Sequence, residues 1–256
     1  MSRISVQAYT LRKRMQTPEG ACGVLRALAQ LGLTWIQPSV PAFWTAEEFG
    51  EKLREYGLRA DSFSCLDADL TAKRDALLRT AQALDAYVIR GGSMSRLQAM
   101  DRDAALAYAL EAERQAAALR AEGLTLVYHF HDYEFCSLDG GETPVDLLLR
   151  HAPSLAFQPD VHWLAAAGFS PEKKLFDFAG RCAYVHMQDY AMLPDGETIR
   201  RETVPVGAGN LDLPGIVQTC EKIGVALYVI EQDNCQKDEL ASVADSVAAL
   251  RRLGIE

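Results

Sequence analysis

Histidines and carboxylates recur at the ends of short apolar segments along this chain. Four of the five histidines stand there, together with an aspartate and a glutamate: His129, His131, His162, His186, Asp160 and Glu231. Imidazole and carboxylate groups that converge on one point suit Mn²⁺, Co²⁺, Fe²⁺ or Zn²⁺. We predict that Asp160, His186 and Glu231 bind such a divalent ion, and His129 is the expected fourth ligand. The alternative is that each group is an interior polar residue paired with its neighbour, as Asp160 and His186 would be in an ion pair.

The same set contains groups that can move a proton. His129 and His131 share the parity of one strand, so both rings face the same side of it. Only one of them can lie deep enough to bind the metal, and a histidine donates or accepts a proton near neutral pH. We therefore predict that the shallower His131 acts on the substrate. Glu134 is expected to hold its far nitrogen, and Glu231 is expected to take a proton from carbon.

Further polar and aromatic residues at these segment ends are predicted to contact the substrate. They are Tyr9, Arg90, His162, Trp163, Gln188 and Asp189. Trp163 offers an apolar surface on which a sugar ring can stack. For Arg90, an ion pair with Glu231 or Asp160 is an equally good interpretation.

The elements that position these residues alternate regularly between strand and helix. We predict strands at 4–9, 33–37, 58–64, 86–90, 124–130, 155–159, 183–187 and 226–231. We predict helices at 23–31, 46–56, 73–83, 102–122, 144–150, 171–178, 213–223 and 239–253. Several helices end at a glycine directly before the next strand, as a left-handed C-terminal cap requires.

Eight strand–helix units in this length predict a (β/α)₈ TIM barrel that occupies residues 1–256 as a single domain. A barrel brings the carboxyl ends of its strands together, which is where the polar residues fall. The alternative is a doubly wound open sheet, but the glycine fingerprint of a dinucleotide site is missing after the first strand. The long connection 190–211 is the expected lid or binding loop.

Composition narrows the choice of partners. The net charge of -9 argues against nucleic acid as a partner. No apolar run approaches the ~20 residues that a membrane-spanning helix needs. The chain opens without a secretory signal pattern, and its six cysteines are scattered singly. We expect a cytoplasmic protein with a small-molecule partner, and a homo-oligomer is compatible with this composition.

Five segments together resemble the xylose-isomerase-like barrels, the superfamily of sugar phosphate isomerases and epimerases. Residues 128–135 (YHFHDYEF) are similar to its Y-H-N-H-D-x-E-F segment, and residues 157–163 (FQPDVHW) to its D-x-x-W segment, which carries an aspartate ligand. Residues 185–189 (VHMQD) are similar to H-x-K-D, where the histidine is a ligand. Residues 206–212 (VGAGNLD) resemble G-x-G-x-x-D, and residues 228–233 (YVIEQD) resemble V-E-Q-D, where the glutamate is a ligand.

The resemblance implies a metal-dependent isomerase or epimerase that abstracts a proton next to the carbonyl of a sugar or keto-sugar and forms a metal-stabilised enediolate. Two departures bear on the mechanism: His129 stands where many relatives carry a glutamate ligand, and Gln188 replaces the lysine of H-x-K-D. Because a neutral amide supplies no cation for a phosphate, we favour an unphosphorylated carbohydrate. The alternatives are a lyase that eliminates from a keto-sugar or keto-glycoside, and a barrel that binds sugar without turnover. An endonuclease of related fold is disfavoured by the few histidines and the negative charge.

Overall fold

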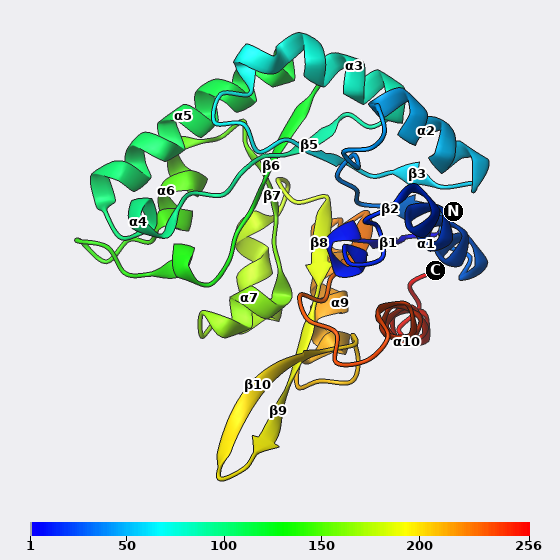
Figure 1. Ribbon diagram of the computed structural model, residues 1–256. Helices are drawn as coiled ribbons and strands as arrows, with labels where there is room; N and C mark the ends of the chain where they lie inside the picture. The colour runs from blue at the N-terminus through cyan, green and yellow to red at the C-terminus, as the bar shows by residue number, and fades with distance from the viewer. Residues whose placement is uncertain (1) are drawn as a thin grey trace.

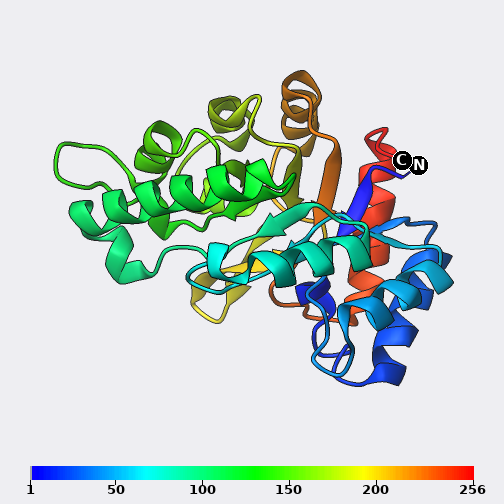
Figure 2. The same ribbon diagram turned by 90° about the horizontal axis from the view of Figure 1, so that it is seen from above.

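Parallel strands alternate with helices around a closed ring in the computed structural model, which describes residues 2–256 (Figures 1 and 2). The barrel strands are β1 (Ile4–Val6), β2 (Trp35–Ile36), β3 (Arg59–Ala60), β4 (Phe63–Ser64), β5 (Val88–Arg90), β6 (Thr125–His129), β7 (Ala156–Gln158), β8 (Tyr184–Met187) and β11 (Leu227–Ile230). β3 and β4 together fill the third position of the barrel. The predicted (β/α)₈ TIM barrel is confirmed.

Two single bridges join the sheets into a ring. Continuous parallel pairing links β4-β5-β6-β7, β8-β11-β1 and β2-β3. The remaining joins are the bridge Gln7↔Gln37 between β1 and β2 and the bridge Asp160↔His186 between β7 and β8. Both bridges lie at the carboxyl ends of the strands, so polar side chains face one another across them.

The helices surround the strands and cover them from outside (Figure 2). They are α1 (Pro18–Gln30), α2 (Ala46–Glu55), α3 (Arg74–Leu84), α4 (Arg96–Ala99), α5 (Arg102–Ala121), α6 (Pro144–His151), α7 (Val161–Ala166), α8 (Pro171–Lys174), α9 (Leu213–Ile223) and α10 (Glu239–Arg252). Threonines cap several of their first turns: the side chains of Thr17, Thr45 and Thr143 each accept a backbone N–H there. None of these helices, over residues 2–256, is long and apolar enough to span a bilayer.

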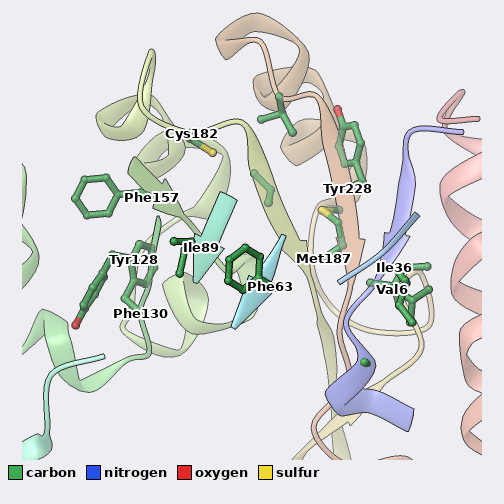
Figure 3. Close-up of a cluster of buried hydrophobic side chains, with 14 of the residues drawn as sticks. Val6, Ile36, Phe63, Ile89, Tyr128, Phe130, Phe157, Cys182, Met187 and Tyr228 are labelled. Atoms are coloured by element: carbon green, nitrogen blue, oxygen red, sulfur yellow. The ribbon is translucent and has the colours of Figure 1, made fainter. Parts of the chain in front are cut away.

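The core lies between the strands and the helices. Side chains from strands all around the barrel fill this layer, among them Ile89, Phe157 and Tyr228 (Figure 3). On β8, Val185 and Met187 belong to this layer, while His186 between them points to the barrel interior, as alternation along a strand requires. The hydrophobic layer therefore holds the strands from outside, while polar groups gather in the interior at the carboxyl ends of the strands.

Several segments differ from the sequence prediction: the strand predicted at 58–64 is split into β3 and β4, α1 begins at Pro18, α4 was not predicted, and the helix predicted at 171–178 is α8 followed by a 3-10 helix. Three further differences lie close to the polar residues. The first strand ends at Val6, and a 3-10 helix follows at Ala8–Leu11, because the Gln7 side chain accepts the Tyr9 N–H and turns the chain. The connection 190–211 is not a plain loop: β9 (Asp189–Asp195) and β10 (Thr198–Val204) form an antiparallel hairpin that projects from the barrel (Figure 1). The short helix α7 was also not predicted.

Candidate active site

Four side chains converge at the carboxyl end of the barrel. One ligand atom from each of His129, Asp160, His186 and Glu231 lies within 4.8 Å of the others. His129 ends β6, Asp160 follows β7, His186 lies in β8 and Glu231 follows β11, and these four strands are neighbours in the ring. We call these four residues the floor. The structure thus brings together the four residues that the sequence analysis proposed as metal ligands.

Burial and mutual charge shape the protonation of the floor. Burial, and then the charge of His186, hold the pKa of His129 well below its usual range, so this ring is neutral at physiological pH. Burial, and then Glu231, raise the pKa of Asp160 well above its usual range. Burial also opposes ionisation of Glu231, but His186, His129 and Arg90 outweigh it and lower its pKa to about 2. The two carboxyl groups titrate as one pair in which Glu231 carries the charge.

The contact between His186 and Glu231 suits a bound cation. His186 Nδ1 lies 2.6 Å from Glu231 Oε2, yet neither atom finds hydrogen-bond geometry with any group in residues 2–256. The other ring nitrogen, Nε2, lies 2.6 Å from Gln37 Oε1. If Nε2 carries the ring hydrogen, Nδ1 and Oε2 present electron pairs to each other. A proton or a metal ion between them removes this repulsion, and two imidazoles with two carboxylates form a donor set that suits divalent transition metals.

Asp160 has two functions, one for each oxygen. Its Oδ1 accepts the backbone N–H groups of His162 (2.7 Å) and Trp163 (3.1 Å) and so caps α7. Its Oδ2 lies 3.8 Å from His186 Nδ1 and accepts the Gln188 amide at 3.3 Å. Gln188 is fully buried, and its own Oε1 accepts the Asp233 N–H. The structure therefore places Gln188 behind Asp160 rather than against a substrate, which corrects its predicted role.

His131 lies above the floor and is 33% exposed. Its ring is 4.9 Å from that of His129, centroid to centroid, and stacks on Tyr133. Glu134, which is completely buried, accepts the His131 backbone N–H at 2.7 Å and the Tyr128 hydroxyl at 2.7 Å, and its Oε2 lies 3.7 Å from His131 Nδ1. Burial disfavours the imidazolium, but Glu134 outweighs it, so the pKa of His131 is raised.

Aromatic rings continue from His131 to the hairpin. Trp163 packs edge-on against His131 (5.4 Å) and His162 (4.7 Å), and His162 packs against Tyr190 of β9 (5.4 Å). We call His131, His162, Trp163 and Tyr190 the rim. Burial, and then the charge of Arg201, lower the pKa of His162 to about 4, so its ring is neutral. The structure brings the predicted residues His162 and Trp163 beside His131 and adds Tyr190, which the sequence analysis did not predict.

Asp189 stabilises the backbone of the neighbouring loop and does not face the open end of the barrel. It is 1% exposed, and its two oxygens accept the backbone N–H groups of Tyr190, Gly207, Gly209 and Leu211. A Cβ on Gly209 would lie 2.2 Å from Asp189 Oδ1, so only glycine fits there. The segment that resembles G-x-G-x-x-D is thus the loop that closes over Asp189. The substrate contact predicted for Asp189 is not supported, because its side chain is buried under this loop.

Two other residues that were predicted to contact the substrate have protein partners of their own. Tyr9 sits on the 3-10 helix, 51% exposed, with the Arg12 guanidinium 3.9 Å from its ring centroid. Arg90 donates to the Pro38 carbonyl and the Ser64 hydroxyl, and burial lowers its pKa although Asp61 and Glu231 oppose this. Arg90 is therefore a half-buried charge that these two oxygens hold within reach of Asp61 and Glu231.

The sequence analysis missed the groups behind His186. Gln37 and Asp61 are buried and follow the second strand and β3. Polar residues at strand ends with inward parity were the signal that identified the floor, and both residues carry that signal.

Comparison with known proteins bears on the fold. A sequence model of the family described as xylose isomerase-like TIM barrel matches residues 25–253. No curated protein matches the chain. A sugar phosphate isomerase/epimerase from Parabacteroides distasonis ATCC 8503 is similar in structure, with a TM-score of 0.79 at 18% identity over 98% of each chain. L-ribulose 3-epimerase gives 0.74 at 17% identity, over 100% of this chain and 95% of that one.

A structure with another activity is similar as well. A probable 3-DHS dehydratase from Bacillus anthracis gives a TM-score of 0.74 at 12% identity, over 97% of this chain and 98% of that one. At these identities the likeness concerns the fold. The choice of reaction therefore has to come from the side chains of the floor and the rim.

Proposed function

The chain belongs to the xylose isomerase-like TIM barrel family, and from that premise we propose that it is a divalent-metal-dependent isomerase or epimerase of a sugar or keto-sugar. The observation that carries the proposal is the floor: four ligand atoms from four neighbouring strands within 4.8 Å, with a partly exposed histidine directly above them. We include in the proposal that residues 1–256 act as one domain.

The floor residues His129, Asp160, His186 and Glu231 would hold the ion. When bound, Mn²⁺, Co²⁺, Fe²⁺ or Zn²⁺ supplies a Lewis acid for the carbonyl of a hydroxy-carbonyl sugar. The low pKa of His129 keeps its electron pair available for this purpose. Asp160 keeps one oxygen for the site because its other oxygen caps α7.

Proton transfer is assigned to groups on two different strands. Glu231, which is ionised, takes the proton from the carbon next to the carbonyl. His131, whose pKa is raised, supplies or accepts a proton near neutral pH, and Glu134 beneath it stabilises the charged ring. Delivery of a proton to the opposite face of the same carbon gives epimerisation, and delivery to the neighbouring carbon gives isomerisation.

The rim would hold the sugar itself. Trp163, His162 and Tyr190 present ring surfaces and edges next to His131, and sugar rings stack on aromatic side chains through their C–H faces. Gln188, in place of a lysine, brings no positive charge to the floor. These features support an unphosphorylated carbohydrate.

Elimination is the second candidate reaction. It needs an acid for the leaving group as well as a base, and His131 with its raised pKa fits that requirement. A probable dehydratase has the same fold, so elimination is a reaction that this fold can accommodate. A lyase and an isomerase are separated by their products, because only the lyase forms an unsaturated product.

The test is metal content followed by turnover on a panel of sugars and keto-sugars, before and after removal of metal by a chelator. We expect about one divalent ion per chain and activity that depends on it. Asp160→Asn keeps the cap of α7 and should lower metal affinity about 10- to 100-fold, whereas Asp139→Asn, at an exposed loop position, should not. Activity that survives complete metal removal, or unchanged metal content in Asp160→Asn, would contradict the proposal, and so would nicking of abasic DNA.

A further inference from the structure

A chain of buried amides and a carboxylate lies behind His186 on the side away from Glu231. Gln7, Gln37 and Asp61 are each at most 4% exposed. His186 Nε2 lies 2.6 Å from Gln37 Oε1, and Gln37 Nε2 donates to Asp61 Oδ1 at 3.2 Å. None of these three residues belongs to the floor or the rim.

One backbone group sets the direction of the hydrogen bonds that join Gln7, Gln37 and His186. The Tyr9 N–H can only donate, and it donates to Gln7 Oε1 at 3.2 Å. Gln7 therefore turns its Nε2 outward, which donates to Gln37 Oε1 at 3.0 Å. The atom of Gln37 that faces His186 is consequently an acceptor, whichever way the Asp61 end is protonated.

The far end is held equally firmly. Asp61 accepts the hydroxyl of Ser5 at 2.5 Å on one oxygen and the hydroxyl of Ser62 at 2.8 Å on the other, beside the Gln37 amide. Ser5 and Ser62 are fully buried. A flipped Gln37 amide would place its oxygen against the carboxylate and its nitrogen against the Gln7 donor, so both neighbours oppose the flip.

We infer that Gln37, held by Gln7 and Asp61, is a positioning residue that fixes the hydrogen of the neutral His186 ring on Nε2 and so turns the Nδ1 electron pair to the floor. An acceptor at 2.6 Å from Nε2 requires a donor there, and a neutral imidazole has one hydrogen. Without Gln37 nothing keeps that hydrogen off Nδ1, where it would point toward Glu231 Oε2, 2.6 Å away, and cover the electron pair. The network thus prevents a contact that would compete with metal binding.

The inference rests on the proposed metal site, but its first test does not need the metal. In metal-free, ¹⁵N-labelled protein in alkaline buffer, the ring nitrogens of His186 report the tautomer, and comparison with His186→Gln assigns them among five histidines. We expect the Nε2–H form in the native chain. An Nδ1–H ring would overturn the inference, and so would a doubly protonated ring that persists in this buffer, because Glu231 would then control the ring.

The second test uses Gln37→Met, which keeps the volume and removes the acceptor. We expect the ring hydrogen to move to Nδ1 and the affinity for Co²⁺ to fall about 10- to 100-fold. Gln115→Met is the matched control, because Gln115 is a buried glutamine that hydrogen-bonds two backbone groups outside the barrel. Equal Co²⁺ affinities in the two variants, with the tautomer unchanged, would overturn the inference.

A third variant covers the case in which Gln37→Met does not fold. In Gln37→Glu combined with Asp61→Asn, the acid and the amide exchange places at the same net charge, so an oxygen still faces His186 and a donor still bridges to position 37. We expect this pair to restore the Nε2–H tautomer and Co²⁺ binding, while Gln37→Glu alone, with two adjacent carboxylates, does not. Failure of the pair to restore the tautomer would overturn the inference. If His186 has the Nε2–H form but the native protein binds no Co²⁺, the proposed function would be overturned, whereas the role inferred for Gln37 would still hold.

Discussion

The floor and the rim of the barrel mouth are built in different ways. The floor residues lie in or directly after barrel strands, and strand pairing joins two of them, Asp160 and His186. The rim residues come from connections: His131 follows β6, Trp163 lies in the short α7, and Tyr190 stands at the base of the hairpin. Strand geometry therefore fixes the floor, whereas each rim residue depends on local contacts that hold its connection. The metal binding proposed for the floor and the proton transfer proposed for His131 need fixed distances, whereas a sugar stacked on the other rim residues tolerates more freedom.

Two histidines of one strand end show the same contrast. His129 is surrounded by the floor, and burial together with His186 lowers its pKa. His131, two residues further on, contacts a buried carboxylate and has a raised pKa. The residue type is the same, and the neighbours decide whether a ring offers an electron pair or a proton.

The largest effect is expected from removing the ring of His131. His131→Ala should lower turnover by about 10²- to 10⁴-fold, the usual contribution of a general acid or base. Metal content should stay at the native level because the floor keeps all four residues. Turnover on the identified substrate and metal analysis measure both effects. Near-normal turnover would mean that His131 only shapes the pocket, and loss of metal would break the distinction between floor and rim.

A smaller effect is expected at the base of the hairpin. Asp189→Asn replaces one acceptor oxygen with an amide nitrogen, so two of the four backbone N–H groups lose their acceptor. We expect the free energy of unfolding to fall by about 1–3 kcal/mol, as measured by denaturant titration. Metal affinity should not change, since Asp189 supports the rim. Asp195→Asn at the exposed hairpin tip is the control, and equal stability of the two variants would count against the role of Asp189 as an anchor.

The floor could be predicted from the sequence because the information that identifies its residues is local and periodic. Parity along a strand and position at its end were sufficient to select Asp160, His186 and Glu231, and a barrel brings such ends together. The strands themselves were recognisable from apolar runs bounded by glycines. Their observed limits are shorter at one end or at both: β5 and β8 begin later than predicted, and β1 ends at Val6, where Gln7 turns the chain.

The rim was harder to predict because its contacts are made between segments distant in sequence. Nothing near Asp189 indicates that the glycine loop 18 to 22 residues later closes over it. The hairpin carries Pro194 and mixed charges, which are not typical of a strand. A signal was present nonetheless: glycine is typical of the first position of a two-residue hairpin loop, here Gly196-Glu197, and Gly196 adopts a positive φ of 61°. The helix α7, which carries Trp163, also had a signal in the sequence, because the floor residue Asp160 is of a type that caps the first turn of a helix.

The smallest effect, and the one that sharpens the contrast between the two histidines, concerns pH. Glu134 raises the pKa of His131 against burial, which lowers it. The protonated ring therefore stabilises the fold below the usual histidine pKa, and this contribution is lost as the pH rises through the raised value. In Glu134→Gln the ring keeps its burial and loses the carboxylate, so the pKa of His131 should fall. The limb of the kcat/KM profile that reports His131 should then move to lower pH, while metal content stays native. Glu197→Gln, at the exposed hairpin tip, should leave the profile in place. A limb that stays in place or moves to higher pH in Glu134→Gln would show that Glu134 holds only the backbone of residue 131.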